Sequence, residues 1–204
     1  MSRGSKDQGR SSRSSSNVLR IVGGKWRSRR LRFVDADGLR PTPDRVRETL
    51  FNWLQFEISG AHCLDAFAGS GALGFEALSR GAASVVMLEK QRPQFLALQD
   101  SAAELQAEGL MLLLGDALQL LQMPAPWQPE SGFDGIFLDP PFHKDLLPKI
   151  CAVLHERALL KSDAFIYVES ESDWQSLALP SAFVLQKTTK AGLVQAYLAR
   201  YQPA

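Results

Sequence analysis

The sequence predicts a doubly wound α/β fold in which a mostly parallel sheet ends in an antiparallel hairpin. Three observations lead to this prediction. From about residue 44 onward, short apolar runs alternate with longer stretches of helical periodicity, which is typical of parallel sheets covered by helices. A glycine-rich segment at 69–74 separates the first apolar run from the helical stretch after it. Finally, the β-rich runs 182–189 and 193–201 are joined by Lys190, Ala191 and Gly192, so they should form a hairpin closing the sheet.

The first helix of this domain is expected to begin beside Thr42. This residue can cap a helix, Pro43 suits the first helical turn, and Asp44 complements the helix dipole. The apolar residues that follow fall on one helical face, and the helix should run to about Phe56.

The remaining elements alternate along the chain, and this order implies parallel pairing of the strands. The expected strands are His62–Ala66, Ser84–Leu88, Leu110–Leu114, Gly132–Leu138 and Ala164–Glu169. The expected helices lie near Ala72–Arg80, Arg92–Gln106, Ala117–Gln122 and Asp145–Glu156. The sequence contains no internal repeat.

Two segments precede the domain of residues 44–204. Residues 1–17 are rich in Ser, Gly, Arg and Lys and are expected to be a disordered basic tail whose role stays open. In the extension of residues 18–43, apolar and basic residues alternate around a Gly23–Gly24 turn, which predicts a small basic hairpin. Trp26 and Phe33 either pack against the domain or stack on a base. The candidate phosphate-binding and RNA-binding residues are Arg20, Lys25, Trp26, Arg27, Arg29 and Arg30.

Charge is distributed unevenly along the chain. The 204 residues carry a net charge of +1, but residues 1–47 have a balance of +9 and the rest a balance of −8. A basic segment on an acidic body indicates a polyanionic partner. No apolar run is long enough to span a bilayer and no secretory signal is evident, so a cytoplasmic protein is expected. Cys63 and Cys151 lie in apolar contexts and are interpreted as reduced core thiols, and no metal-ligand pattern appears.

The segment after the first strand carries the strongest local signal. Gly69 and Gly71 allow a tight turn, and the helix start beyond them offers unpaired N–H groups to a ligand. With Gly74 they also match the dinucleotide fingerprint, which by itself fits NAD enzymes as well. The loop residues expected to bind a cofactor are Phe67, Ala68, Gly69, Ser70 and Gly71.

Three acidic residues favour S-adenosylmethionine (SAM) over NAD. Asp65 ends the first strand, where its carboxylate suits an ammonium group and would repel a pyrophosphate. Glu89, next to Lys90, ends the second strand and can accept hydrogen bonds from both ribose hydroxyls. Asp116, next to Ala117, follows the third strand and can accept from the adenine amine. Each acid alone has a structural alternative, since it can cap a helix or face solvent, but all three stand at the strand ends where such sheets bind ligands.

The tetrapeptide Asp139-Pro140-Pro141-Phe142 follows the fourth strand and is the candidate catalytic site. An exocyclic amine on a base is a poor nucleophile because its lone pair is delocalised into the ring. The Asp139 carboxylate and the Pro140 carbonyl can accept its two N–H groups, and Phe142 can stack on a flipped base. A rigid turn with a buried aromatic residue is the structural alternative. His143 need not be catalytic, and the mechanism needs no metal.

The chain resembles the RsmD-type 16S ribosomal RNA guanine-N2 methyltransferases. The matching stretches are 20–27, 39–54, 64–80, 139–142 and 166–171. The resemblance implies a Rossmann-like class I SAM-dependent methyltransferase with a small N-terminal extension. Its substrate would be a guanine of 16S RNA within the small ribosomal subunit or an assembly intermediate. It also implies that Arg47 and Asn52 line the cofactor mouth. The long Ser/Arg-rich start departs from the family pattern.

Several alternatives stay open at this stage. A DNA adenine-N6 methyltransferase would use the same loop, although Tyr is more usual than Phe142 there. A protein-glutamine methyltransferase usually begins its loop with Asn, so Asp139 argues against it. A non-catalytic RNA-binding assembly factor is disfavoured by the intact acidic set, and an NAD dehydrogenase by the lack of a hydride-accepting site. A monomer is the expected oligomeric state.

Overall fold

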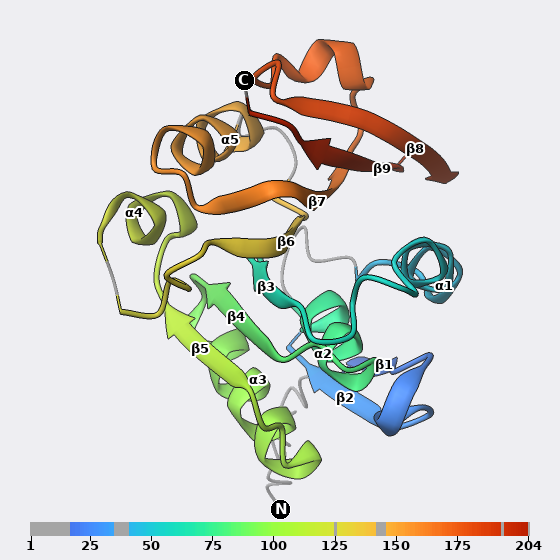
Figure 1. Ribbon diagram of the computed structural model, residues 1–204. Coiled ribbons are helices and arrows are strands. Elements are labelled where there is room, and N and C mark those ends of the chain that lie inside the picture. The colour runs from blue at the N-terminus through green and yellow to red at the C-terminus, as the bar shows by residue number, and fades with distance from the viewer. Residues whose placement is uncertain (1–16, 35–40, 125, 142–145, 193, 204) are drawn as a thin grey trace, which may run out of the picture.

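A seven-stranded sheet forms the centre of the protein (Figure 1). The computed structural model describes residues 17–34, 41–124, 126–141, 146–192 and 194–203. The strand order is β5-β4-β3-β6-β7-β9-β8. The first five strands in this order are parallel, and β9 and β8 are antiparallel to their neighbours. The strands are β3 (His62–Asp65), β4 (Ser84–Glu89), β5 (Leu110–Leu114), β6 (Phe133–Leu138), β7 (Leu160–Ser170), β8 (Phe183–Ala191) and β9 (Val194–Tyr201).

Helices cover both faces of the sheet, as expected for parallel strands joined by crossovers. Helices α4 and α5 pack on one face, and α1, α2 and α3 lie on the other (Figure 1). Each face therefore has its own apolar cluster. The helices are α1 (Asp44–Trp53), α2 (Ala72–Ser79), α3 (Arg92–Leu105), α4 (Ala117–Gln122) and α5 (Leu146–Glu156).

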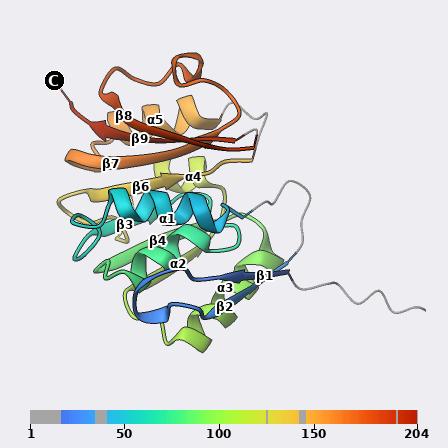
Figure 2. The same cartoon turned by 90° about the vertical axis from the view of Figure 1, so that its right-hand side faces the viewer.

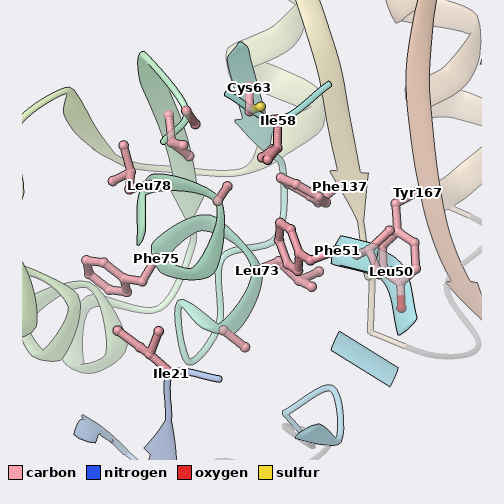
Figure 3. Packing of buried hydrophobic residues seen from close by; sticks show 14 of the residues in the cluster. Ile21, Leu50, Phe51, Ile58, Cys63, Leu73, Phe75, Leu78, Phe137 and Tyr167 are labelled. Atoms are coloured by element: carbon pink, nitrogen blue, oxygen red, sulfur yellow. The ribbon is translucent and has the colours of Figure 1, made fainter. Parts of the chain in front are cut away.

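An aromatic group joins α1 to the middle of the sheet (Figure 3). The rings of Phe51 and Phe137 lie 5.9 Å apart between centroids, and Phe137 lies 6.4 Å from the ring of Tyr167. All three side chains are buried. This packing holds the last turns of α1 against β6 and β7.

The predicted fold class is confirmed, and the predicted elements agree with the observed ones with small shifts at their ends. The helix expected to reach Phe56 ends at Trp53, because the backbone N–H groups of Glu57 and Ile58 turn back to the Leu54 carbonyl. Strand β7 begins at Leu160, four residues earlier than predicted, through a register irregularity against β6. The expected start of α5 at Asp145 lies outside the described residues.

The N-terminal extension forms the predicted hairpin, but its turn differs from the prediction. Strands β1 (Asn17–Arg20) and β2 (Arg30–Phe33) are antiparallel, and residues 21–29 connect them through a short 3-10 helix, η1 (Gly24–Trp26). The prediction of a tight turn at Gly23–Gly24 is therefore wrong. Ile21 and Trp26 cause the difference, because both are buried and pull this connection down onto the domain.

The connection between β1 and β2 lies against the end of α2 (Figure 2). The Trp26 N–H donates to Ser79 Oγ at 2.9 Å, and that hydroxyl donates to the Gly23 carbonyl at 2.5 Å. Gly24 has φ of +73°, and a Cβ there would lie 1.9 Å from the Ser79 carbonyl oxygen. Only glycine fits this close approach. The hairpin thus shares the apolar cluster of α1 and α2.

Residues 1–16 of the expected tail lie outside the described residues, whereas Asn17 begins β1. Cys63 and Cys151 are free and buried, as expected. Burial raises the pKa of both thiols, that of Cys151 to about 12, so neither is a nucleophile. Among the described helices, none has the length and apolar character to cross a bilayer.

Candidate active site

A cavity of about 900 Å³ opens at the carboxyl ends of the parallel strands. Its volume lies within the range of small-molecule and cofactor sites. Its position follows from the topology, because ligands of open α/β sheets bind where the strands end. Its walls come from the glycine-rich turn, the residues before α1, the loop after β6 and the β8–β9 hairpin.

Five neighbouring strands bring acidic side chains to this cavity, and Glu171 directly after β7 lines it as well. In sheet order the acidic row consists of Asp116 after β5, Glu89 on β4, Asp65 on β3, Asp139 after β6 and Glu169 on β7. The sequence predicted the first four as site residues, and the structure brings all four together. It also adds Glu169, which the sequence analysis did not single out.

The glycine-rich turn holds its shape through backbone contacts. Gly71 precedes α2 with φ of +76°, and a Cβ there would lie 2.5 Å from the Phe75 ring. The Gly69 N–H donates to Glu89 Oε2 at 2.9 Å, and Gln94 Nε2 donates to the Gly69 carbonyl at 2.6 Å. The predicted loop residues Phe67, Ala68, Gly69 and Ser70 line the cavity, whereas Gly71 supports the turn from behind.

Asp65 is a buried carboxylate with an unusual pKa. Its Oδ2 accepts the Gly74 N–H at 3.1 Å, and its side chain lines the cavity. Burial raises its pKa to about 7, against the opposing effect of hydrogen bonds from Gly74 and Phe67. Within the described part of the chain, no Lys or Arg forms an ion pair with Asp65. A cationic ligand would favour its charged form.

Glu89 and Asp116 are both held by backbone N–H groups. Glu89 Oε1 accepts from Gln91 at 2.6 Å, in addition to the Gly69 contact on its other oxygen. Asp116 Oδ1 caps α4 by accepting from Leu118 at 3.1 Å, and Lys90 Nζ lies 3.0 Å from its Oδ2. Asp116 therefore caps a helix, which was the structural alternative to a role in binding. It also lines the cavity, as do Lys90 and Ala117.

The catalytic candidates Asp139, Pro140 and Pro141 line the cavity beside β6. No residue that the structure describes donates a hydrogen bond to the Asp139 carboxylate. Burial raises its pKa well above the usual value, and the nearby Glu169 and Asp65 raise it further. This carboxylate therefore needs donors from a ligand or from water. Phe142 and His143 lie outside the described residues.

Glu169 completes the acidic row through contacts from distant parts of the sequence. Its Oε1 accepts from Thr42 Oγ1 at 2.5 Å and from Tyr167 Oη at 2.8 Å. Burial raises its pKa. The prediction that Thr42 caps α1 is wrong, because its hydroxyl turns to Glu169 and Pro43 occupies the cap position without a side-chain bond. The rule applied to the other strand ends could have found Glu169, since the predicted strand ends there.

The comparison with known proteins identifies the family. The family model described as "Conserved hypothetical protein 95" matches residues 19–200. Ribosomal RNA small subunit methyltransferase D of Haemophilus influenzae is 43% identical over 178 residues, which cover 86% of this chain and 90% of that protein. Its namesake from Escherichia coli is 42% identical over 181 residues, 89% of each chain. The chain belongs to the RsmD family.

A solved structure supports the same assignment. The putative methyltransferase yhhF from Escherichia coli superposes with a TM-score of 0.80 at 40% identity, covering 92% of this chain and 100% of that one. The fold is therefore that of class I methyltransferases, with the mixed sheet described above. Membership of this methyltransferase family implies use of SAM. Among the described residues, no group of three or more His, Cys, Asp or Glu is arranged to hold a metal ion.

Arg47 and Asn52, expected at the cofactor mouth of an RsmD-family protein, do not line the cavity. The Arg47 guanidinium is fully buried and donates to the Thr42 carbonyl at 3.1 Å and to the Arg20 carbonyl at 2.8 Å. It also pairs with Glu76 at 3.4 Å. Arg47 thus ties the hairpin and the start of α1 to α2, whereas Asn52 is exposed on α1.

The predicted RNA-binding residues divide into two groups. Arg20, Lys25, Arg27, Arg29 and Arg30 are exposed. Arg20 pairs with Asp44 at 3.2 Å and Arg29 donates to the Glu104 carbonyl at 2.9 Å, whereas the side chains of Lys25, Arg27 and Arg30 are exposed to phosphates. Trp26 is only 7% exposed and lies beneath Lys25, whose Nζ is 4.5 Å from the ring centroid. Of the two roles that the sequence left open for the hairpin's aromatic residues, the structure favours packing, and Phe33 is buried as well.

Proposed function

We propose that this chain transfers a methyl group from SAM to the N2 amine of a guanine in 16S ribosomal RNA of the small subunit. The observation that carries the proposal is the Asp139 carboxylate, which faces the cavity without a donor from the described residues. An amine is the group that supplies such donors. The names of the 42–43% identical relatives, ribosomal RNA small subunit methyltransferases, support the substrate class.

The cavity has the donor and acceptor groups that SAM requires. Asp65 would accept from the methionine ammonium, Glu89 from the ribose hydroxyls and Asp116 from the adenine amine. The raised pKa of Asp65 supports this fit, because a buried carboxylate without a cation is suited to a cationic ligand. The turn residues from Phe67 to Ser70 would pass along the ligand, and Gly71 would support this turn from behind. When bound, SAM supplies an electrophilic methyl group. Its positively charged sulfur is a good leaving group, so the transfer needs no metal.

The loop after β6 would act on the base. The Asp139 carboxylate and the Pro140 carbonyl accept the two N–H groups of the amine and favour its tetrahedral, nucleophilic form. When the N–CH3 bond forms and the S–CH3 bond breaks, the amine nitrogen carries one proton too many, and the Asp139 carboxylate would take it. Its raised pKa brings it closer to the pH at which proton transfer is effective. Phe142 would stack on the base.

The exposed basic residues of the β1–β2 hairpin would bind the phosphates of the RNA. They stand on a body whose remaining residues carry a balance of −8, so the attraction to RNA must come from the N-terminal segment. The protein is proposed to act as a monomer in the cytoplasm on assembled or partly assembled small subunits.

Methyl transfer from radiolabelled SAM tests the proposal directly. The purified protein would be given small ribosomal subunits from cells that lack the activity, naked 16S RNA and unmethylated DNA. The proposal expects label in the RNA, mapped to guanine N2. Label in DNA alone would instead support the adenine-N6 alternative, and binding of SAM without transfer to any of the three would contradict the proposed substrate.

A further inference from the structure

Asp139 and Glu169 occupy equivalent positions on neighbouring strands. Phe137 of β6 pairs in register with Tyr167 of β7, and both side chains lie in the same apolar cluster. Side chains two residues further along a strand point to the same face. Asp139 directly follows β6 and Glu169 lies on β7, and neighbouring strands lie about 4.8 Å apart. Both residues line the cavity, and the two carboxylates are close enough for the charge of Glu169 to raise the pKa of Asp139. The two carboxylates form a pair at the end of β6 and β7.

The two oxygens of Glu169 have different surroundings. Oε1 is fixed by the hydroxyls of Thr42 and Tyr167, at 2.5 and 2.8 Å. No described residue donates to Oε2. Among the described residues, every fully buried side-chain oxygen has a hydrogen-bond partner, so Oε2, which has none, is not fully buried. Glu169 is only 4% exposed and lines the cavity, so the exposed part of Oε2 faces the cavity.

Glu169 lies on the side of Asp139 away from the strands assigned to SAM. Strands β3, β4 and β5 lie on one side of β6 in the sheet, and β7 lies on the other. The start of α1 and the β8–β9 hairpin contribute the apolar residues Pro43, Val46, Val194 and Ala196 to the cavity lining, and Glu171 follows β7 there. Apolar walls beside the carboxylates of Asp139 and Glu169 suit a flat ring that carries adjacent hydrogen-bond donors on one edge.

We infer that Glu169 Oε2 accepts the N1–H of the target guanine and so selects guanine over bases without a donor at N1. This inference rests on the proposed function. Guanine presents N1–H beside its N2 amine, which matches two neighbouring carboxylates. Adenine presents a lone pair at N1 beside its amine, so the same carboxylate would face an acceptor. A buried carboxylate that faces another acceptor loses binding free energy, so the contact with N1 discriminates guanine from adenine.

Thr42 and Tyr167 are positioning residues in this arrangement. Their hydroxyls occupy Oε1, which fixes the orientation of the carboxylate and leaves Oε2 for the base. Thr42 stands directly before α1, and the chain there is held by Arg47 through the Thr42 carbonyl at 3.1 Å. The start of α1 thereby becomes part of the base-binding side of the cavity.

A base analogue separates this role of Glu169 from a merely structural one. 2-Aminopurine keeps the exocyclic amine of guanine but has an acceptor instead of a donor at N1. It would replace the target guanine in 16S RNA by ligation, and kcat/KM would be measured for both RNAs with the wild-type protein and Glu169→Gln. The NH2 group of Gln can donate to the N1 acceptor of 2-aminopurine, whereas the carboxylate of Glu can only accept from the N1–H of guanine. The substitution should therefore shift the preference from guanine toward 2-aminopurine.

The wild-type protein is expected to prefer guanine over 2-aminopurine by at least about tenfold, the minimum for a lost hydrogen bond to a charged group. Glu169→Gln should lose at least about tenfold on guanine and shift the ratio toward 2-aminopurine. Glu108→Gln, the same change at an exposed residue outside the cavity lining, should keep the wild-type ratio.

Two results would overturn the inference, and they differ from failure of the proposed function. A guanine to 2-aminopurine ratio that is the same in the wild-type protein and Glu169→Gln would exclude N1 recognition by Glu169. So would wild-type protein that methylates both RNAs equally, and this result does not depend on the folding of any variant. If the wild-type protein does not methylate guanine RNA at all, the proposed function itself fails.

Discussion

The two ends of the acidic row are built differently. At the β3–β5 end, Asp65, Glu89 and Asp116 each accept hydrogen bonds from backbone N–H groups close to them in sequence. At the β6–β7 end, Glu169 is held by side chains, and no described residue donates to Asp139. The first arrangement gives a rigid template for a ligand of fixed shape. The second leaves acceptors open for a substrate that must enter and leave.

The largest effect should follow from removing Asp139. We expect Asp139→Ala to lower turnover by about 1000-fold, within the range for a lost acid–base group, because the amine loses an acceptor for its N–H. SAM affinity should change little, since the residues assigned to SAM belong to β3, β4 and β5, whereas Asp139 follows β6. Single-turnover methyl transfer and calorimetry measure the two quantities, with Asp100→Ala on the exposed face of α3 as the control. Normal turnover at saturating SAM, combined with lost SAM affinity, would reverse the assignment.

A smaller effect is expected from pH at the cofactor end. The pKa of Asp65 is about 7 in the free protein, and the ammonium of SAM needs its charged form. Affinity should therefore be complete above pH 7 and fall by up to about tenfold per unit as the pH drops below it. Calorimetry from pH 5.5 to about pH 8 would check this expectation. The slope due to Asp65 should disappear in Asp65→Asn.

The same pKa shift predicts how the stability of the free protein depends on pH. Because the pKa of Asp65 is higher in the folded state than its ordinary value of 3.8, the folded state binds this proton more tightly between these two pH values. The carboxyl group therefore contributes its stabilisation at low pH and loses it as the pH rises to about 7. The raised pKa values of Asp139 and Glu169 act in the same direction. Thermal unfolding of Asp65→Asn should depend less on pH over this range, and an unchanged dependence would contradict the shift.

The smallest effect is expected from the basic hairpin, which lies outside both ends of the row. Replacing Arg27, Arg29 and Arg30 together by Gln should weaken RNA binding and flatten its dependence on salt, by up to about 0.7 in the logarithmic slope for each phosphate contact. Lys149→Gln on α5, across the sheet from α2 and the hairpin (Figure 1), serves as the control. A filter-binding titration with an unchanged salt slope in the triple variant would exclude the hairpin from RNA binding.

The contrast between the two ends also explains what the sequence could predict. Strand β5 and helix α4 begin and end at the predicted residues, because local apolar patterns and the Asp116 cap determine them. The four predicted acids follow from strand ends, and all four line the cavity. The hydrogen bond between Thr42 and Glu169 joins residues 127 positions apart, and no local pattern indicates it.

The remaining corrections have the same physical origin. The sequence shows Arg47 as one basic residue on an amphipathic helix, and nothing local indicates that its guanidinium is buried against the Arg20 carbonyl and Glu76. Likewise, the alternation around Gly23–Gly24 predicts a hairpin correctly, but burial of Trp26 against α2 determines the longer turn. Tertiary packing overrides the local preference at these positions.

The affinity of SAM for Asp65→Asn, Asp139→Asn and the double variant tests the division of the acidic row most directly. Asp65→Asn should weaken binding by at least about tenfold, since it removes a charged partner of the ammonium. Asp139→Asn alone should leave the dissociation constant within about threefold of wild type, and the double variant should match Asp65→Asn within the same margin, as expected for independent sites. If Asp139→Asn weakens SAM binding as much as Asp65→Asn does, the two ends do not have separate roles.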